Sequence, residues 1–248
     1  MKILSILAIA ASLLVPAAVE AAVNKGVVGS DHDFSKTNYL AFNTRRGVCT
    51  PCHTAHATDP AQIAPLFAHK TSTGPFTMYS SPTIKHTPGT VPDGASLACL
   101  SCHDGTIGVN SPIQGTQGGI STNTPVFVQP NHKVGPDLHT DHPISFVYDA
   151  ALAAASGELE NPVTYKIGDP KTTLTVQTPP VPATWTGTDL TGKTIDEALL
   201  VNHKMQCTSC HDPHWIKGNT PLRGQATIVD GNDADGRGSL MCRTCHIK

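Results

Sequence analysis

The chain has 248 residues, with 17 Lys and Arg against 19 Asp and Glu, and a formal net charge of −2. Its basic residues are scattered, which excludes the clustered basic face that nucleic-acid binding requires. It contains only two Trp, four Tyr and six Phe but 20 Pro and 21 Gly, so few large apolar side chains are available for a core. We therefore expect something other than side chains to fill part of the interior.

The first residues have the pattern of a secretory signal peptide. Lys2 precedes an apolar run from Ile3 to Leu14, and small residues surround a plausible cleavage site after Ala21. A membrane helix here would be short and interrupted by Pro16, and no later stretch reaches the roughly 18 apolar residues that span a bilayer. We expect residues 1–21 to be removed and the mature chain to be secreted, without a transmembrane segment.

All eight cysteines fall in four strings of the form C-x-x-C-H. Two thiols three positions apart lie within one local turn and can add to the two vinyl groups of one haem, while the next histidine places its imidazole against the iron. We therefore expect four covalently attached c-type haems. The predicted attachment cysteines are Cys49, Cys52, Cys99, Cys102, Cys207, Cys210, Cys242 and Cys245, and the predicted proximal iron ligands are His53, His103, His211 and His246.

Zinc binding and disulfide formation are two other uses of eight cysteines, and each explains the motifs less well than haem attachment. Two four-cysteine zinc sites would use every thiol, but zinc does not explain why a histidine follows every second cysteine. Structural disulfides suit a secreted chain, but four identical close spacings are an odd framework for joining distant segments. Haem attachment explains both the spacing and the histidines.

Taken in chain order, the segments between the motifs carry weak secondary-structure signals. Apart from the motifs themselves, the expected helices are 60–70, 149–159 and 195–204; 105–137 is expected as loop, 165–178 as a small hairpin, and 176–185 as a stiff Pro-rich connector. The fold class expected is a multihaem cytochrome c. It consists mostly of irregular coil, with short helices and few short strands, packed around four haems.

The motifs form two pairs separated by a long middle stretch. The first member of each pair has the same extended form, CTPCHTAH at 49–56 and CTSCHDPH at 207–214, which indicates a degenerate internal repeat. We predict a first dihaem half over 22–150 and a second over 151–248, or else one continuous tetrahaem domain.

Each iron also needs a ligand on its second face. Histidines outside the motifs outnumber the mature chain's methionines, Met78, Met205 and Met241, so we favour bis-histidine ligation and the low reduction potentials that accompany it. His56 and His214 each lie three residues after a proximal histidine, on the same side of that haem. Each therefore either binds the iron of a neighbouring haem or is a surface residue.

Several strings together indicate a family resemblance. They are HDFS at 32–35, VCTPCHTAH at 48–56, ACLSCHDGT at 98–106, DHPISF at 141–146, CTSCHDPH at 207–214 and MCRTCH at 241–246. Their order resembles that of the doubled C-x-x-C-H multihaem cytochromes, and in particular of the outer-surface tetrahaem (OmcE-type) members that polymerise into extracellular conducting filaments. The resemblance spans nearly the whole mature chain.

At matching positions, the resemblance implies that the distal iron ligands are His32, His56, His142 and His214. In the filament-forming members one distal histidine comes from the neighbouring subunit, and His32, near the expected mature N-terminus, is our candidate for that role. His203 and His86 are the reserve distal ligands. The remaining histidines, interpreted as loop or surface residues, are His69, His132 and His139.

These patterns predict an electron carrier rather than an enzyme, because irons with two protein ligands have no open position for a substrate. The resemblance implies a homopolymer at the outer cell surface or outside the cell, with other cytochromes as redox partners and extracellular electron acceptors. One alternative is a monomeric periplasmic electron shuttle. Another is a multihaem oxidoreductase with one open iron. In each case we expect the haem-free chain to be largely disordered, because the haems supply the packing surface.

Overall fold

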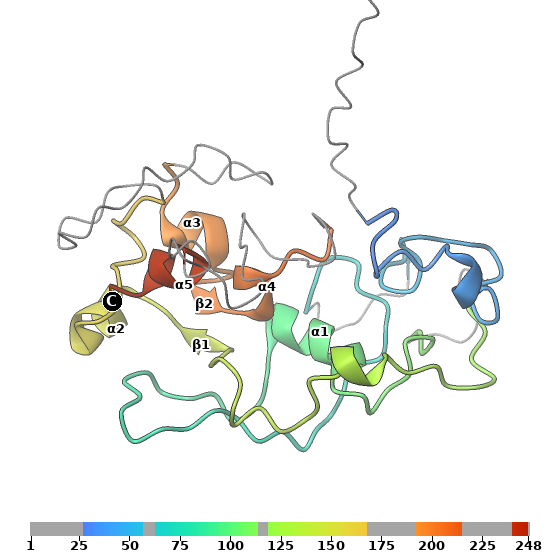
Figure 1. The fold of residues 1–248 in the computed structure, drawn as a ribbon, viewed down its shortest axis with the longest axis horizontal. Coiled ribbons are helices and arrows are strands. Elements are labelled where there is room, and N and C mark those ends of the chain that lie inside the picture. The colour runs from blue at the N-terminus through green and yellow to red at the C-terminus, as the bar shows by residue number, and fades with distance from the viewer. Residues whose placement is uncertain (1–26, 57–62, 114–118, 168–191, 215–239, 248) are drawn as a thin grey trace, which may run out of the picture.

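The computed structural model describes residues 27–56, 63–113, 119–167, 192–214 and 240–247. The predicted signal peptide, the Pro-rich connector and most of the predicted hairpin lie outside these ranges. Most described residues are coil and turn, joined by short helices and one pair of short strands (Figure 1). This coarse architecture agrees with the irregular fold expected from the sequence.

The regular elements are few and short. In chain order they are the 3-10 helix η1 (Thr37–Tyr39), α1 (Gly94–His103), the 3-10 helix η3 (Pro130–His132), β1 (Phe146–Val147), α2 (Ala150–Ser156), α3 (Ile195–Leu199), β2 (Lys204–Met205), α4 (Cys207–Cys210) and α5 (Leu240–Cys245). The N-terminal segment with η1 lies at one end of the molecule, and α2, α3 and α5 gather at the other (Figure 1). Helix α1 lies between these two ends.

The predicted helix at 149–159 forms as α2, whereas the one at 195–204 forms only over 195–199, as α3. The rest of the second prediction is wrong, because residues 201–204 form a tight turn that leads into β2. Asp149 accepts a hydrogen bond from the Leu152 N–H at the start of α2, and Gly157, with φ of 66°, ends that helix in the left-handed conformation. Thr194 and Glu197 form a capping box at the start of α3.

The helix predicted at 60–70 is wrong for its described part, 63–70, which consists of bends, turns and isolated bridges. Pro65 lacks the N–H that a helix interior needs, and Leu66 adopts a positive φ of 54°. Phe67 instead forms an antiparallel bridge with His53 of the first motif. The segment 105–137 is irregular apart from η3 in its described residues, as expected.

A small core joins residues from both predicted halves. Strands β1 and β2 are antiparallel, with Phe146 opposite Met205, and both side chains are buried. Tyr148 and Ile195 are buried in the same cluster, and Cys245 of the last motif also belongs to it. Residues before and after the predicted boundary at 150 therefore pack against each other, while the division into two dihaem halves stays a prediction.

A second, smaller cluster lies in the N-terminal half. Phe34 and Phe42 pack at 6.3 Å between ring centres, and Val109 and Ile120 complete the buried set. Cys102 of the second motif packs against this cluster. Each apolar cluster thus includes or contacts a motif cysteine, which places an attachment motif at the edge of a core.

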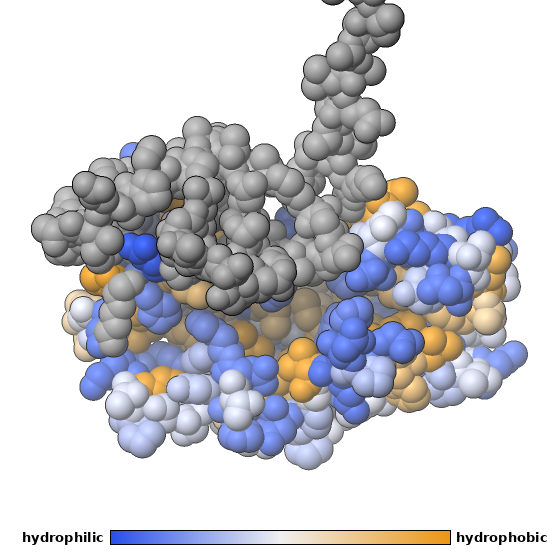
Figure 2. Space-filling model, in the orientation of Figure 1, coloured by the Kyte–Doolittle hydropathy of each residue, from blue (hydrophilic) through white to orange (hydrophobic). Residues whose placement is uncertain are grey.

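The visible surface mixes hydrophilic residues with scattered hydrophobic ones (Figure 2). Several exposed hydrophobic residues are valines, including Val147 on β1, Val163 and Val201. Within the described ranges, the helices are all too short and too polar to cross a bilayer.

Replacing a core side chain should measure how much the α3 cluster contributes. Ile195 is 0% exposed, so Ile195→Ala should lower the free energy of unfolding by about 2–5 kcal/mol through lost burial and a cavity. Val163→Ala, at a 49% exposed position, should change it by less than about 0.5 kcal/mol. Denaturant unfolding of the two variants tests this, and equal losses would contradict the placement of Ile195.

Candidate functional site

The four C-x-x-C-H strings adopt similar local turns. In the first, third and fourth, the histidine N–H donates to the carbonyl of the first cysteine, at 2.8 Å for His53 and 2.9 Å for both His211 and His246. His103 ends α1, so the second string is helical as well. One helical turn therefore brings each pair of thiols to the same face as the histidine that follows.

Three of the four motif histidines face a second histidine from elsewhere in the chain. The ring centres are 6.0 Å apart for His32 and His103, 5.8 Å for His53 and His214, and 6.5 Å for His142 and His246. The three partners are all residues that the family resemblance implied as distal ligands.

These separations are informative because they exceed direct ring stacking. Two metal–nitrogen bonds of about 2 Å each, end to end across one ion, together with the radius of each ring, place two trans imidazole centres about 6 Å apart. A histidine pair at this spacing fits two axial ligands to one iron.

Backbone carbonyls hold two of these rings by one nitrogen. His103 Nδ1 lies 2.7 Å from the carbonyl oxygen of His132, and His142 Nδ1 lies 2.9 Å from that of Pro143. An imidazole that donates from Nδ1 to a carbonyl presents the lone pair of Nε2, which is the common arrangement of metal-bound histidines. In both rings Nε2 is therefore the nitrogen left to bind a metal.

His32 is held in a similar way by a distant part of the chain. It hydrogen-bonds to the backbone of Pro213, the residue before His214. Burial, reinforced by the nearby His103, lowers the pKa of His32. A lowered pKa favours the neutral ring, which is the form that binds a metal.

Each motif has at least one partly or fully buried thiol. Cys52, Cys99, Cys102, Cys207 and Cys210 are partly buried, and Cys245 is buried. Burial raises the pKa of Cys52 to about 11 and that of Cys102 to about 12. Cys99 and Cys207 interact directly, and their hydrogen bond raises the pKa of Cys99 while it lowers that of Cys207 to about 7. Burial penalises a charged thiolate, whereas an uncharged thioether escapes this penalty. The surroundings of Cys52 and Cys102 thus suit the thioether bonds of an attached haem.

The fourth predicted distal ligand, His56, and the third motif's His211 are both exposed. Their motifs are nevertheless connected, because His214 from the third motif faces His53 of the first. His56 and His214 occupy equivalent positions in the two extended strings.

The reserve ligand His203 lies at the tip of a tight turn. Asn202 and His203 have positive φ angles of 53° and 60°, the conformation of a type I′ turn between Val201 and Lys204. His203 Nδ1 is 2.8 Å from the Asp196 carboxylate, and its side chain is 70% exposed. As placed, His203 is paired with an acid at the surface and does not face a motif histidine.

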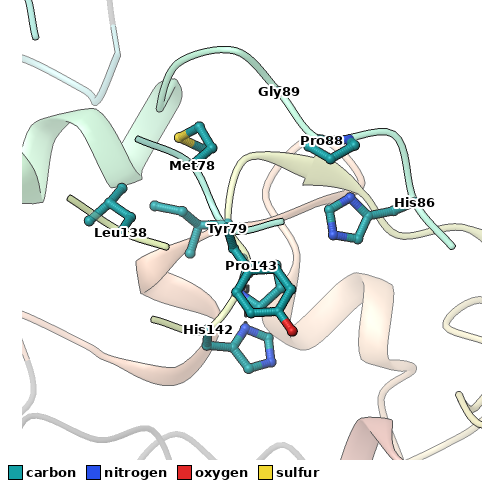
Figure 3. A pocket seen from close by; sticks show the side chains of 9 residues that line it. Met78, Tyr79, His86, Pro88, Gly89, Leu138, His142 and Pro143 are labelled. Carbon is teal, nitrogen blue, oxygen red and sulfur yellow. Dashed lines mark hydrogen bonds between the residues drawn. The ribbon is translucent and has the colours of Figure 1, made fainter. Parts of the chain in front are cut away.

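The other reserve ligand, His86, lies in the same pocket as the predicted distal ligand His142. It lines a pocket together with Tyr79 and His142, which come from separate segments of the chain (Figure 3). The His86 ring stacks on Phe146 with centres 3.9 Å apart, and neither ring nitrogen has a well-formed hydrogen bond. His86 is thus a neighbour of His142, while His142 itself faces His246.

The interpretation of His69 as a loop or surface residue is wrong with respect to burial, because this side chain is only 1% exposed. Its Nδ1 lies 2.7 Å from the Lys70 carbonyl oxygen and its Nε2 lies 2.9 Å from that of Gly108. His69 therefore connects the segment after the first motif to the loop after the second. His132 and His139 are exposed, as expected.

Sequence reasoning missed three polar residues that connect two motifs: Asp93, Ser96 and Gln206. Gln206 accepts from the Ser96 N–H and donates to the Asp93 carboxylate, although it lies more than a hundred residues after both. The one available signal is that Gln206 directly precedes the third C-x-x-C-H string.

All eight cysteines are free thiols in the structure, and none forms a disulfide. Among the described residues, no group of three or more His, Cys, Asp or Glu side chains is arranged to hold a metal ion. No protein-family model matches the chain, and no curated protein matches it either.

A substitution at His69 should show how much this buried histidine contributes to stability. Burial lowers the pKa of His69, and the neutral ring has one N–H to donate to either carbonyl oxygen. His69→Leu removes that hydrogen bond from a buried group, so the free energy of unfolding should fall by about 1–3 kcal/mol. His139→Leu, in an exposed pair with Asp137, should change it by less than about 0.5 kcal/mol. Thermal or denaturant unfolding would measure both, and an unchanged His69→Leu protein would contradict this role.

Proposed function

We propose that the protein is a tetrahaem c-type cytochrome that transfers electrons, with each haem held by one C-x-x-C-H motif and each iron bound by two histidines. The observation that carries the proposal is the set of three histidine pairs, each joining a motif histidine to a distant one at the spacing of two ligands on one metal. When bound, haem supplies an iron that cycles between the ferric and ferrous states.

The residues divide the work of holding each haem. The cysteines form the covalent attachment, the motif histidine binds one face of the iron, and the distal histidine binds the other. Two imidazoles on every iron leave no open position, which favours electron transfer over conversion of a substrate. The chain's own contribution is to fix the ligands, the distances between haems and the polarity around them.

The crossing of ligands between the first and third motifs supports close haem packing. His214 follows the third motif but faces His53 of the first, and we propose the reciprocal pairing of His56 with His211. Each of these two haems would then be bound by residues from both motifs. Because electron tunnelling falls steeply with distance between haem edges, such cross-ligation favours rapid transfer within the pair.

Removing one distal ligand should leave the haems attached but change one iron. His214→Ala protein should retain four haems per chain in a pyridine haemochrome assay, because the thioether bonds remain. One iron in four should become high-spin in electron paramagnetic resonance, whereas His139→Ala should leave every iron low-spin. Four low-spin irons in His214→Ala would show that another residue supplies this ligand. Carbon monoxide binding by the unmodified protein would instead support an oxidoreductase with an open iron.

We also propose, on the family resemblance, that the protein polymerises outside the cell and passes electrons to extracellular acceptors. One observation favours the alternative of a discrete periplasmic shuttle. His32, our candidate for the ligand shared between subunits, faces His103 of its own chain at 6.0 Å. An internal role for His32 requires no neighbouring subunit.

Cryo-electron microscopy of the native haem-loaded protein, with His32→Ala as the comparison, distinguishes these arrangements. If His32 crosses between subunits, the native protein should form filaments, and His32→Ala should abolish them while one haem becomes high-spin. If His32 is internal, one haem should become high-spin with no change in the state of assembly. Isolated native particles would rule out the filament.

A further inference from the structure

The second and third motifs meet through a buried polar contact that haem ligation does not require. Helix α1 carries Cys99, Cys102 and His103 at its C-terminal end, and it packs against α4, which contains the third motif's cysteines. Cys99 and Cys207, the first cysteine of each motif, interact directly. Haems attached at these cysteines would approach each other at their thioether edges.

Each of the two helices is capped by a side chain from the other. The Ser96 N–H in the first turn of α1 donates to Gln206 Oε1 at 2.9 Å, and the Cys207 N–H that begins α4 donates to Ser96 Oγ at 2.9 Å. The first N–H groups of a helix have no partner within it and need an outside acceptor. Gln206 and Ser96 supply those acceptors in both directions.

Burial makes this exchange specific. Gln206 is 3% exposed and Ser96 is 0% exposed, so water cannot replace either acceptor. Asp93, at the N-cap of α1, makes no side-chain cap to its own helix. Its carboxylate instead accepts from Gln206 Nε2 at 2.8 Å and from the Lys204 ammonium.

The surrounding backbone fits the same contact. Gly94 has a positive φ of 48°, which glycine adopts without strain, and a Cβ there would lie 3.5 Å from Gln206 Nε2. Asp93 N–H donates to Ser145 Oγ at 3.0 Å, and Ser145 N–H donates to the Met205 carbonyl at 2.7 Å. The start of α1 is thus joined to the strand directly before the third motif.

We propose that Gln206 and Ser96 are positioning residues that set the distance and mutual orientation of the second and third haems. This inference rests on the proposed function, because it concerns how haems at these two motifs are placed. Neither residue touches iron. They act by holding the two short helices that carry the attachment cysteines.

The test compares haem-loaded Gln206→Leu and Ser96→Ala proteins with the unmodified protein. Gln206→Leu removes one cap and the bond to Asp93, whereas Ser96→Ala removes only the cap on Cys207 and is the milder change. The control is Asn110→Leu, which removes a buried amide that hydrogen-bonds Ser121, Thr124 and Val126 and makes no bond between motifs. All three variants should melt at lower temperature.

Circular dichroism in the Soret band reports the mutual orientation of neighbouring haems, and transient absorption after photoreduction reports electron equilibration among them. The Gln206→Leu and Ser96→Ala proteins should each retain four low-spin haems. Both should lose part of the Soret couplet, and electrons should equilibrate among their haems more slowly. Asn110→Leu should leave both signals unchanged.

Two outcomes separate this inference from the proposed function. If the Soret couplet and the equilibration rate are unchanged in Ser96→Ala and in haem-loaded Gln206→Leu protein, the positioning role of Gln206 and Ser96 is overturned while the proposed function stands. Lower melting temperatures would then show only that the two residues stabilise the fold. Fewer than four haems in the unmodified protein would instead overturn the proposed function.

Discussion

The placement of histidines opposite one another at about 6 Å is the constraint around which this chain is organised. His53 and His214 are far apart in sequence, as are His32 and His103, yet the ring centres of these pairs lie only 5.8 and 6.0 Å apart. Such pairing demands that loops with little regular structure end at defined positions. The remaining contacts can be understood as the means of holding those loops.

Buried polar contacts fix much of the position of these loops, because apolar side chains are scarce. Two small clusters are buried, one around Ile195 and Tyr148 and one around Phe34 and Phe42. Between them, His69 lies between the carbonyl oxygens of Lys70 and Gly108, and Gln206 and Ser96 accept hydrogen bonds from the first N–H groups of each other's helices. A buried group of this kind is costly when unpaired and therefore selects a single arrangement of the chain. In the proposed function, haems would add the large flat surfaces that the side chains lack.

The contacts between motifs also suggest how electrons would pass through the protein. His214, which follows the third motif, faces His53 of the first, and the second and third motifs meet at Cys99 and Cys207. His32, which faces the second motif, hydrogen-bonds to Pro213 beside His214. Three of the four motifs therefore converge on the short segment that begins at Gln206. Small displacements of that segment would affect several transfer steps together.

The sequence by itself determined the local chemistry: four strings of one C-x-x-C-H pattern, the scarcity of apolar residues, the helix at 149–159, and the first half of the helix predicted at 195–204. The caps of both helices lie within a few residues of them. It failed at 63–70, where Pro65 and Leu66 interrupt an otherwise helical pattern, and at His69, whose burial depends on carbonyls brought from another loop. Only the tertiary structure decided which histidines face each other and that Gln206 caps α1. Those relations join residues as much as 161 positions apart, as with His53 and His214, and local spacing holds no information about them because the intervening chain has no regular period that would carry it.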